Sequence, residues 1–356
     1  MRVIQILPTI SYGDAVSNDA LSLDGVICEM GIKTGIYAEI IGKNLPKDRV
    51  RKVGKLKNLK KEDVIIYHMS TGSELNFSLD KYKCRKMMIY HNITPPEFFR
   101  PYSHEAYALT QYGYEGLDFL RDHVEYCLAD SEYNKSELLK HGYKCPVDVR
   151  PVLIPFNDYR QSPDLETIKK YNDGRTNIIF VGRIAPNKKQ ENIIKSFYFY
   201  KKINPESRLI LVGSYAGMEN YHERLENYVK ALGLSDVIFT GHVKFSEILS
   251  YYRIADVFLC MSEHEGFCVP LTEAMFFNVP IIALDAGAVG GTLGGSGVLL
   301  PDNNPVFTSE MIEYTVKNSD FRRHIISGQK KRLADFSYEK TGRLFRTQLK
   351  KFIDSR

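Results

Sequence analysis

The feature that most constrains the fold is a repeated alternation of short apolar runs with segments of helical spacing. The runs are continuous rather than interrupted by polar residues, as expected for strands buried on both faces of a parallel sheet. Because the alternation occurs in both halves of the chain, it predicts an α/β protein with two doubly wound, Rossmann-like parallel sheets. The expected strands are residues 3–7, 33–38, 64–68, 87–91, 126–130, 149–153, 178–182, 209–213, 237–240, 257–261 and 280–284.

The segment after the first expected strand shows what the helices look like in sequence. Apolar residues from Val16 to Met30 recur at helical spacing, and Gly31 stands where a helix C-terminus favours glycine. A chain of 356 residues is long enough for two domains of about 150–180 residues each. The proline-containing segment 150–158 suits a connection, so we expect one domain over residues 1–160 and another over 161–337.

Charge, cysteine usage and hydropathy exclude several classes of protein. A net charge of +5 is too small for a dedicated nucleic-acid binder. The six cysteines form no Cys-x-x-Cys pair and have no spacing that suits zinc, which favours core thiols in a reducing cytoplasm and no metal site. Apolar runs are too short for a transmembrane helix, and residues 1–8 lack the length and cleavage signature of a signal peptide. We therefore expect a cytoplasmic protein.

The most informative segment, residues 262–275, follows the expected strand 257–261. Glu265 is placed in the loop at the carboxyl end of that strand, where ligands of open α/β sheets bind. Pro270 suits the first position of a helix, which would put Glu273 in the first helical turn. The two carboxylates could accept hydrogen bonds from sugar hydroxyls. Alternatively, Glu273 complements the helix dipole and Glu265 is a solvated loop charge.

Two further segments follow neighbouring expected strands. Arg183 comes directly after strand 178–182, and Lys188 stands at the start of the next helix, which together would form a cationic clamp for a diphosphate. Alternatively both are surface cations, and we expect Lys189 to be solvated. The glycine-rich segment 285–297 could line a ligand or serve only as a flexible connection.

These residues resemble a known family. The second half is similar to retaining family-4 glycosyltransferases of the GT-B fold, in which two Rossmann-like domains face a cleft. The motifs that carry the resemblance are Thr240-Gly241-His242-Val243, Ala255-Asp256-Val257, Glu265-Gly266-Phe267, Pro270, Glu273-Ala274-Met275 and Pro280. The first half resembles the family more weakly, through Tyr12-Gly13-Asp14, the run from Tyr90 and His91 to Glu97, and Ala129-Asp130-Ser131.

The resemblance implies roles for individual residues. Arg183 and Lys188 would contact the donor diphosphate, Glu265 the donor sugar and Glu273 the ribose. His91 would face the reacting sugar from the first domain, and Gly13 would lie near the phosphates and the acceptor. The donor site would also include Val243, Gly266, Phe267, Cys268 and Val269. The terminal segment 338–356 would be a helix that packs back on the first domain.

The sequence departs from the family pattern at two places. Cys268 stands where the family often has glycine, so we expect positive φ to be less available there. Gly290-Gly291 replaces a common Pro-Glu pair, and we expect a floppier loop. Among other histidines, His264 is expected to be a loop residue, and His68, at a strand end, a possible neighbour of the cleft.

We therefore expect a retaining hexosyltransferase that uses a nucleotide-diphosphate sugar as co-substrate and acts on a carbohydrate or lipid-linked acceptor in surface polysaccharide or glycolipid assembly. No Asp-x-Asp occurs, so no metal cofactor is expected. A nicotinamide dehydrogenase is disfavoured because the first turn, residues 8–14, holds a single glycine. A non-catalytic nucleotide-sugar binding module remains the alternative. The basic run 49–61 is either a solvated face or a contact with an anionic membrane, here the inner membrane face.

Overall fold

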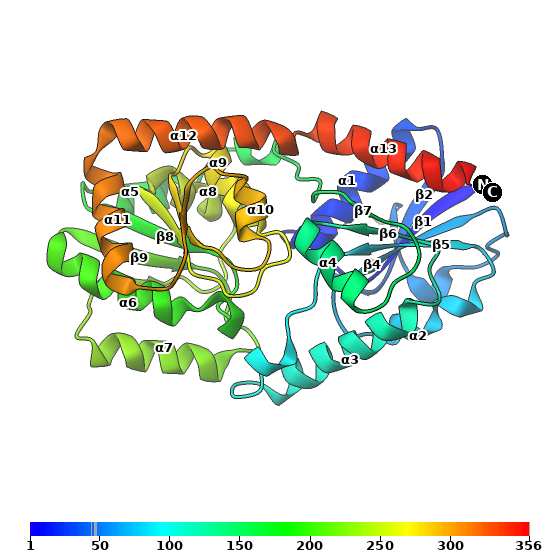
Figure 1. Ribbon diagram of the computed structural model, residues 1–356, viewed down its shortest axis with the longest axis horizontal. Coiled ribbons are helices and arrows are strands. Elements are labelled where there is room, and N and C mark those ends of the chain that lie inside the picture. The colour runs from blue at the N-terminus through cyan, green and yellow to red at the C-terminus, as the bar shows by residue number, and fades with distance from the viewer. Residues whose placement is uncertain (44, 46–47, 356) are drawn as a thin grey trace. The chain divides into compact units, whose positions relative to one another are not determined.

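The computed structural model describes residues 1–43, 45 and 48–355, which form two compact units (Figure 1). Unit 1 comprises residues 1–96, 107–156 and 335–356, and unit 2 comprises residues 97–106 and 157–334. The division at residue 156 lies close to the expected boundary at 160. Segment 97–106 differs from expectation, because it packs with unit 2 although it lies in the first half of the sequence.

Unit 1 is built on a seven-stranded parallel sheet of order β3-β2-β1-β4-β5-β6-β7. Buried residues fill the strands on both faces, which is why the sequence shows continuous apolar runs. The strands are β1 (Arg2–Ile10), β2 (Lys33–Ile41), β3 (Val50–Lys52), β4 (Val64–Met69), β5 (Arg85–Tyr90), β6 (Tyr126–Ala129) and β7 (Val147–Val149).

Helices cover both faces of this sheet (Figure 1). On one face α1 and the terminal helix α13 pack their apolar side chains, including Leu23, Phe345 and Leu349, against the strands. On the other face lie α2, α3 and α4. Helix α1 ends as expected, with Gly31 at φ +74°. The bounds are α1 (Ala15–Glu29), α2 (Leu75–Ser78), α3 (His104–Leu120), α4 (Glu132–Lys140) and α13 (Tyr338–Asp354).

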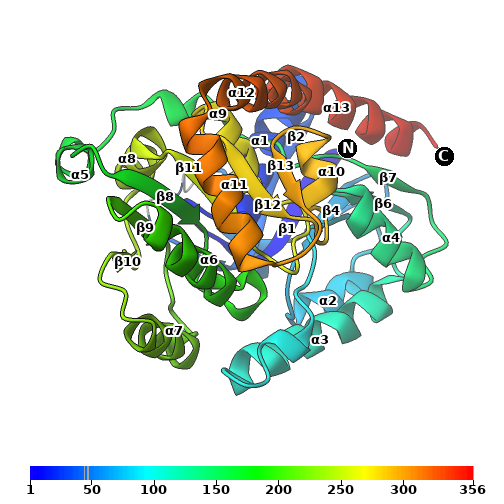
Figure 2. The same ribbon diagram turned by 60° about the vertical axis from the view of Figure 1, so that its left-hand side comes forward.

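Unit 2 repeats the plan with a six-stranded parallel sheet of order β10-β9-β8-β11-β12-β13. Helices α8, α9 and α10 cover one face, while α6 and α11 lie side by side on the other (Figure 2). The strands are β8 (Thr176–Val181), β9 (Ser207–Val212), β10 (Val237–Phe239), β11 (Val257–Cys260), β12 (Ile281–Leu284) and β13 (Val298–Leu300). The helices are α5 (Leu165–Tyr171), α6 (Gln190–Ile203), α7 (Glu219–Ala231), α8 (Phe245–Ile254), α9 (Val269–Phe276), α10 (Val289–Leu293), α11 (Pro305–Lys317) and α12 (Ser319–Leu333).

In each sheet the strand order reverses once, between β1 and β4 in unit 1 and between β8 and β11 in unit 2. Crossover helices leave such a point in opposite directions and open a crevice at the carboxyl ends of the two strands, where ligands of this fold class bind. The residues that follow β1, β4, β8 and β11 are therefore the first to examine for function.

One expected strand was wrong. The strand at this position, β7, ends at Val149, so residues 150–153 are not part of it. Arg150 N still donates to Ala129 O at 2.8 Å, but Pro151 has no N–H, and Leu153 N donates instead to the Asp19 carboxylate. The short strands β3 and β13 were missed, since three residues at a sheet edge leave little apolar pattern. Within the described residues, no helix is long and apolar enough to cross a membrane.

Candidate functional site

The reversal point of unit 2 brings together residues that the sequence separates widely. Lys188 ends the single 3-10 turn Pro186–Lys188 after β8, and Glu265 lies in the loop after β11. Lys188 Nζ lies 2.7 Å from Glu265 Oε2, and the carboxylate side chain is only 8% exposed. Burial alone would lower the pKa of Lys188, but the adjacent Glu265 carboxylate outweighs it and raises that pKa. Lys188, the residue expected to bind the diphosphate, and Glu265, the residue expected to bind the sugar, are thus partners of each other.

Arg183 lies at the same edge of the sheet, directly after Gly182. Its side chain is exposed, and its guanidinium donates to Ala216 O at 3.4 Å, at the weak end of hydrogen-bond distances. In contrast with Lys188, this cation is therefore held loosely within unit 2.

Lys189 corrects one expectation, whereas His264 lies in a loop as expected. Lys189 is not simply solvated: its backbone is left-handed, at φ +51°, and its Nζ lies 3.2 Å from Glu263 Oε2 and 5.7 Å from the Phe98 ring centre. His264 is buried, with its ring 6.2 Å from that of Phe98. Segment 97–106 thus covers the loop that carries Glu265, which explains why it belongs to unit 2.

The glycine-rich segment packs on the backbone of Glu265. Ala288 N donates to Glu265 O at 2.9 Å. Gly287, at φ +57°, permits this approach, because a Cβ there would lie 2.6 Å from Glu265 O. The expected floppiness at Gly290-Gly291 was wrong, since both residues belong to helix α10. The segment therefore supports the Glu265 loop rather than serving as a loose connection.

Cys268 overturns another expectation. It is the N-cap residue of α9 and lies in the left-handed region, at φ +69° and ψ +67°, so a residue with a side chain adopts a conformation that favours glycine. The buried thiol packs in the apolar core of unit 2, near the Cys260 thiol and the Glu265 carboxylate. Such a conformation is tolerated where the surrounding structure imposes it.

Glu273 is not in the first turn of its helix. Helix α9 begins at Val269 rather than Pro270, so Glu273 lies beyond the residues on which the helix dipole acts most strongly. Its two carboxylate oxygens accept hydrogen bonds from the Tyr159 hydroxyl at 2.7 Å and the Tyr252 hydroxyl at 2.6 Å. Burial raises the pKa of Glu273 despite these two donors.

The other expected donor-site residues lie near this edge or at the matching edge of unit 1. Val243 lies between β10 and α8 and packs against the core. Phe267 is buried and Gly266 half-buried in the Glu265 loop, and Val269 is the first residue of α9. Gly13 follows β1 in unit 1 at φ +83°, with open space where a Cβ would point.

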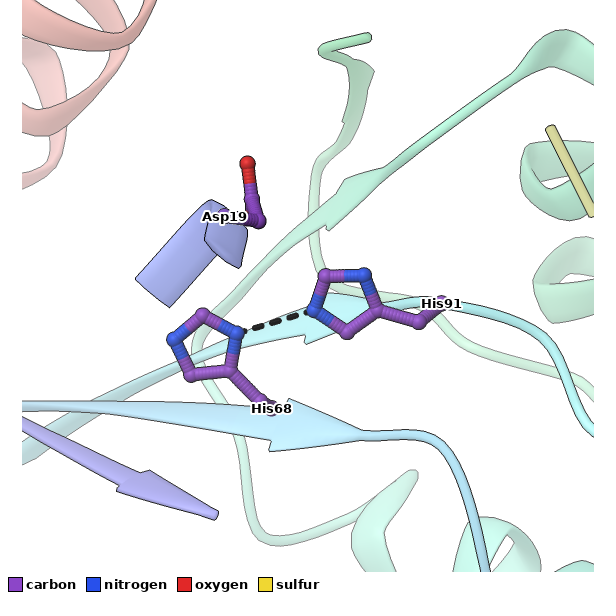
Figure 3. Close-up of side chains that lie close together, drawn as sticks. All are labelled: Asp19, His68 and His91. Carbon is purple, nitrogen blue, oxygen red and sulfur yellow. Dashed lines mark hydrogen bonds between the residues drawn. The ribbon is translucent and has the colours of Figure 1, made fainter. Parts of the chain in front are cut away.

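His91 follows β5 in unit 1, and its side chain is 3% exposed. Its Nδ1 lies 2.7 Å from Asp130 Oδ2. Its Nε2 lies 2.8 Å from His68 Nδ1, the contact drawn as a dashed line in Figure 3. Both ring nitrogens are therefore engaged within unit 1. His68 lies within the reversal-point strand β4, one residue before its end, and is fully buried.

Sequence reasoning missed two charged residues behind His91. The Arg150 guanidinium donates to both Asp19 carboxylate oxygens, at 2.8 and 2.7 Å, and lies 3.5 Å from Asp130 Oδ1. All three side chains are buried. A usable signal was present, because Asp19 stands on the apolar face of the first helix, one position before Ala20.

Sequence comparisons find similarity to known glycosyltransferases. Residues 162–332 match the family model described as Glycosyl transferases group 1. An uncharacterized glycosyltransferase of Methanocaldococcus jannaschii is 30% identical over 173 residues, which is 48% of this chain and 47% of that protein. A D-inositol 3-phosphate glycosyltransferase of Kineococcus radiotolerans is 31% identical over 144 residues, 36% of this chain and 33% of that one. The chain spans half or less of the length of these relatives.

Solved structures resemble the whole chain. Anabaena HepE in complex with UDP-glucose aligns with a TM-score of 0.77 at 17% identity, covering 99% of this chain and 100% of that one. Sucrose-phosphate synthase from Thermosynechococcus elongatus aligns with a TM-score of 0.77 at 15% identity, covering 100% of both chains. The likeness shows the fold: two parallel-sheet α/β units of the GT-B architecture.

Proposed function

We propose that this chain is a retaining glycosyltransferase that moves a hexose-type sugar from a nucleotide-diphosphate sugar to an acceptor hydroxyl without a metal ion. The observation that carries the proposal is the Lys188–Glu265 ion pair at the reversal point of unit 2. It lies inside the segment that matches the group 1 glycosyltransferase model.

The ion pair prepares both groups for a donor. A bound diphosphate would replace Glu265 as the partner of Lys188, since phosphate oxygens and ammonium groups form strong charge-assisted hydrogen bonds. The released Glu265 carboxylate would then accept hydrogen bonds from hydroxyls of the donor sugar. Arg183, exposed and loosely held, would close on the same diphosphate.

In the proposed reaction, the bond between the anomeric carbon and the diphosphate oxygen breaks. The acceptor oxygen bonds to the same face of that carbon, and its proton passes to the departing diphosphate oxygen. Lys188 and Arg183 stabilise the charge that develops on the leaving group, and this electrostatic contribution is often the largest in such catalysis. Two cations therefore perform the task that a metal ion performs in other transferases.

Glu273 would bind the donor ribose. Tyr159 and Tyr252 fix the direction of its carboxylate and leave each oxygen able to accept a further hydrogen bond. Gly13 and His91 of unit 1 would act on the phosphates, the acceptor and the reacting sugar. The backbone around Val243, and that from Gly266 to Val269, would complete the donor site.

We also propose that the acceptor is a carbohydrate or a lipid-linked glycan in surface polysaccharide or glycolipid assembly, reached from the cytoplasm at the inner membrane face. Arg51 and Lys52 are exposed on the edge strand β3, and exposed lysines follow at positions 55, 57, 60 and 61. Basic side chains of this kind are attracted to anionic lipid. Sedimentation with anionic vesicles, but not with neutral ones, would support peripheral contact. Failure to sediment with either kind of vesicle would contradict it.

The enzyme proposal is tested by product analysis with UDP-, GDP- and ADP-sugars and a panel of acceptors. Lys188→Ala should lower turnover steeply, because one charge-assisted contact contributes about 1.5–3 kcal/mol. Lys195→Ala, on an exposed position of α6, is the matched control and should leave turnover unchanged. EDTA should have little effect on the wild type.

Two results would contradict the proposal in different ways. Complete loss of activity on chelation, restored by magnesium, would exclude the metal-free mechanism. Donor binding without hydrolysis or transfer to any acceptor would favour the non-catalytic binding module instead.

A further inference from the structure

The buried polar chain around His91 determines where its protons lie. We propose that His68 is a positioning residue that accepts a hydrogen bond from His91 and thereby holds His91 as a doubly protonated imidazolium. The chain runs within unit 1 from Ala20 through Gln5, His68 and His91 to Asp130.

The first step fixes the tautomer of His68. Gln5 Nε2 donates to Ala20 O at 2.9 Å, so Gln5 Oε1 is the atom that faces His68 Nε2, also at 2.9 Å. An amide oxygen only accepts hydrogen bonds. His68 Nε2 therefore carries a proton, and in the neutral ring His68 Nδ1 is an acceptor.

The second step follows from the short contact between the rings. His68 Nδ1 and His91 Nε2 lie 2.8 Å apart, with the ring planes 5° from parallel (Figure 3). Two lone pairs at this distance would repel, so one proton must lie between the nitrogens. If His68 is neutral, that proton belongs to His91 Nε2.

The third step gives His91 its second proton. Its Nδ1 lies 2.7 Å from Asp130 Oδ2, and a carboxylate can only accept. His91 then donates from both nitrogens and is positively charged. The charges balance: the carboxylates of Asp19 and Asp130 are opposed by Arg150 and the imidazolium, and a neutral His91 would leave the buried group with a net negative charge.

Placing the charge on His68 instead is unfavourable. Burial and the neighbouring His91 and Arg150 lower the pKa of His68. Burial also opposes the charged form of His91, but the Asp130 carboxylate, with a further contribution from Asp19 against that of Arg150, raises the pKa of His91. The excess proton therefore lies on the ring that touches a carboxylate.

A divalent cation is a different explanation for Asp19, His68 and His91 lying close together. The geometry favours the proton, because both Asp19 oxygens already accept from Arg150 and the two histidine nitrogens are at hydrogen-bond distance. The consequence for catalysis rests on the proposed function: a His91 imidazolium cannot take the proton of an acceptor alcohol, so it would act through its charge.

The test is a proton-coupled nitrogen NMR measurement on the full chain labelled with ¹⁵N-histidine, from pH 6 to 9. His91→Gln assigns the signals. We expect His91 to show two protonated nitrogens at pH 7.5 and His68 to show one. His68→Phe, which removes the acceptor, should lower the pH at which His91 loses a proton by about one unit, a tenfold change. His68→Asn, which can still accept, should restore most of it, and His324→Phe, on exposed α12, should change nothing.

A singly protonated His91 at pH 7.5 would overturn the proposal, as would zinc-dependent shifts of both histidine signals that chelation reverses. If His68→Phe fails to fold, the wild-type spectrum still decides the question. Because the spectra require no substrate, they stand whether or not glycosyl transfer is found. Where transfer is found, His68→Phe should lower kcat more than it raises KM for the donor.

Discussion

Most of the candidate donor-binding residues lie directly after the carboxyl ends of β8 and β11. Lys188 and Glu265 are each other's partners, and Cys268 keeps a left-handed backbone directly before helix α9. These positions could be found in the sequence because loop residues after parallel strands meet at one edge of a sheet. Their pairing could not be found, because it depends on the length and course of two loops.

At Cys268 the backbone conformation limits what a substitution can do. Cys268→Gly removes the strain of a left-handed residue but also removes a buried thiol. Because these effects oppose each other, the free energy of unfolding of this variant should differ from that of the wild type by less than about 1 kcal/mol. Cys268→Val should destabilise by about 2 kcal/mol or more, because a β-branched side chain is least compatible with positive φ. Urea unfolding of both variants makes the comparison. Equal destabilisation would show that the conformation is not what constrains this position.

Glu273 should matter for stability through its tyrosines. Glu273→Ala removes the carboxylate that accepts from the buried hydroxyls of Tyr159 and Tyr252 and should cost about 1–3 kcal/mol, whereas Glu273→Gln retains an acceptor and should cost less. Tyr314→Phe, exposed on α11, is a control for loss of a tyrosine hydroxyl. Thermal unfolding decides. If the two Glu273 variants are equally stable, the hydrogen bonds are not responsible.

The same carboxyl group should give a pH dependence of defined sign. Because burial raises the pKa of Glu273, the folded state binds this proton more tightly than the unfolded chain does. Its contribution is therefore fully present below the unfolded value of 4.5 and is lost as the pH rises through the raised value. The stability of wild type relative to Glu273→Gln should fall over that window. A difference that grows with pH would contradict this assignment.

At the scale of elements, the continuous apolar runs were a reliable guide and the edges were not. The nine described strands that do not lie at a sheet edge could all be expected, because a strand buried on both faces has to be apolar throughout. In contrast, β3 is a charged edge strand and gives no such pattern. The end of β7 depends on Pro151, which has no N–H, and on the Asp19 carboxylate, which accepts from Leu153 N 134 positions away. The proline is a local signal, but no local pattern reports the long-range contact.

An ion cluster fixes the opposite edge of the unit 2 sheet. Asp236 lies 2.7 Å from Arg175 before β8 and 2.8 Å from Lys201 near the end of α6. Burial opposes its ionisation, but the hydrogen bonds from Lys201, Arg175 and Ser235 lower the pKa of Asp236 to about 2. Asp236→Asn should therefore cost on the order of 2 kcal/mol at pH 7.

The pH window for Asp236 lies on the acid side. Its contribution is present above the unfolded value of 3.8 and should be lost as the pH falls through about 2. Asp320→Asn, in an exposed pair with Arg323, is the control and should change the unfolding free energy by less than about 0.5 kcal/mol. If the two variants have equal stability at pH 7, the cluster contributes nothing measurable.

For the whole molecule, sequence reasoning gave two sheets of the GT-B architecture but placed one segment wrongly. Residues 97–106 pack with unit 2 because Phe98 lies against His264 and Tyr102 against Tyr221. Such aromatic contacts join residues more than one hundred positions apart, so periodicity and composition carry no trace of them. The roles of Glu265 and His91 in catalysis and of Glu273 in donor binding remain predictions.

The terminal helix should be necessary for unit 1. Phe345, Leu349 and Phe352 of α13 lie in the same core as Leu23 and Ile27 of α1. Leu349→Ala should destabilise by about 2–5 kcal/mol, as large-to-small core substitutions do. Leu344→Ala, on the exposed side of the same helix, should cost less than about 1 kcal/mol. Similar melting temperatures for both variants would show that α13 is dispensable.

The central claim is that Lys188 binds the donor diphosphate while Glu265 binds the donor sugar. Calorimetric titration of Lys188→Ala and Glu265→Ala, each with a sugar nucleotide and with the bare nucleoside diphosphate, tests it most directly. Lys188→Ala should lower the affinity for both ligands by about tenfold or more. Glu265→Ala should bind the bare diphosphate at least as tightly as the wild type, because Lys188 has lost a competing partner, and should lose the extra affinity that the sugar confers. Equal weakening of the bare diphosphate by both substitutions would contradict the account.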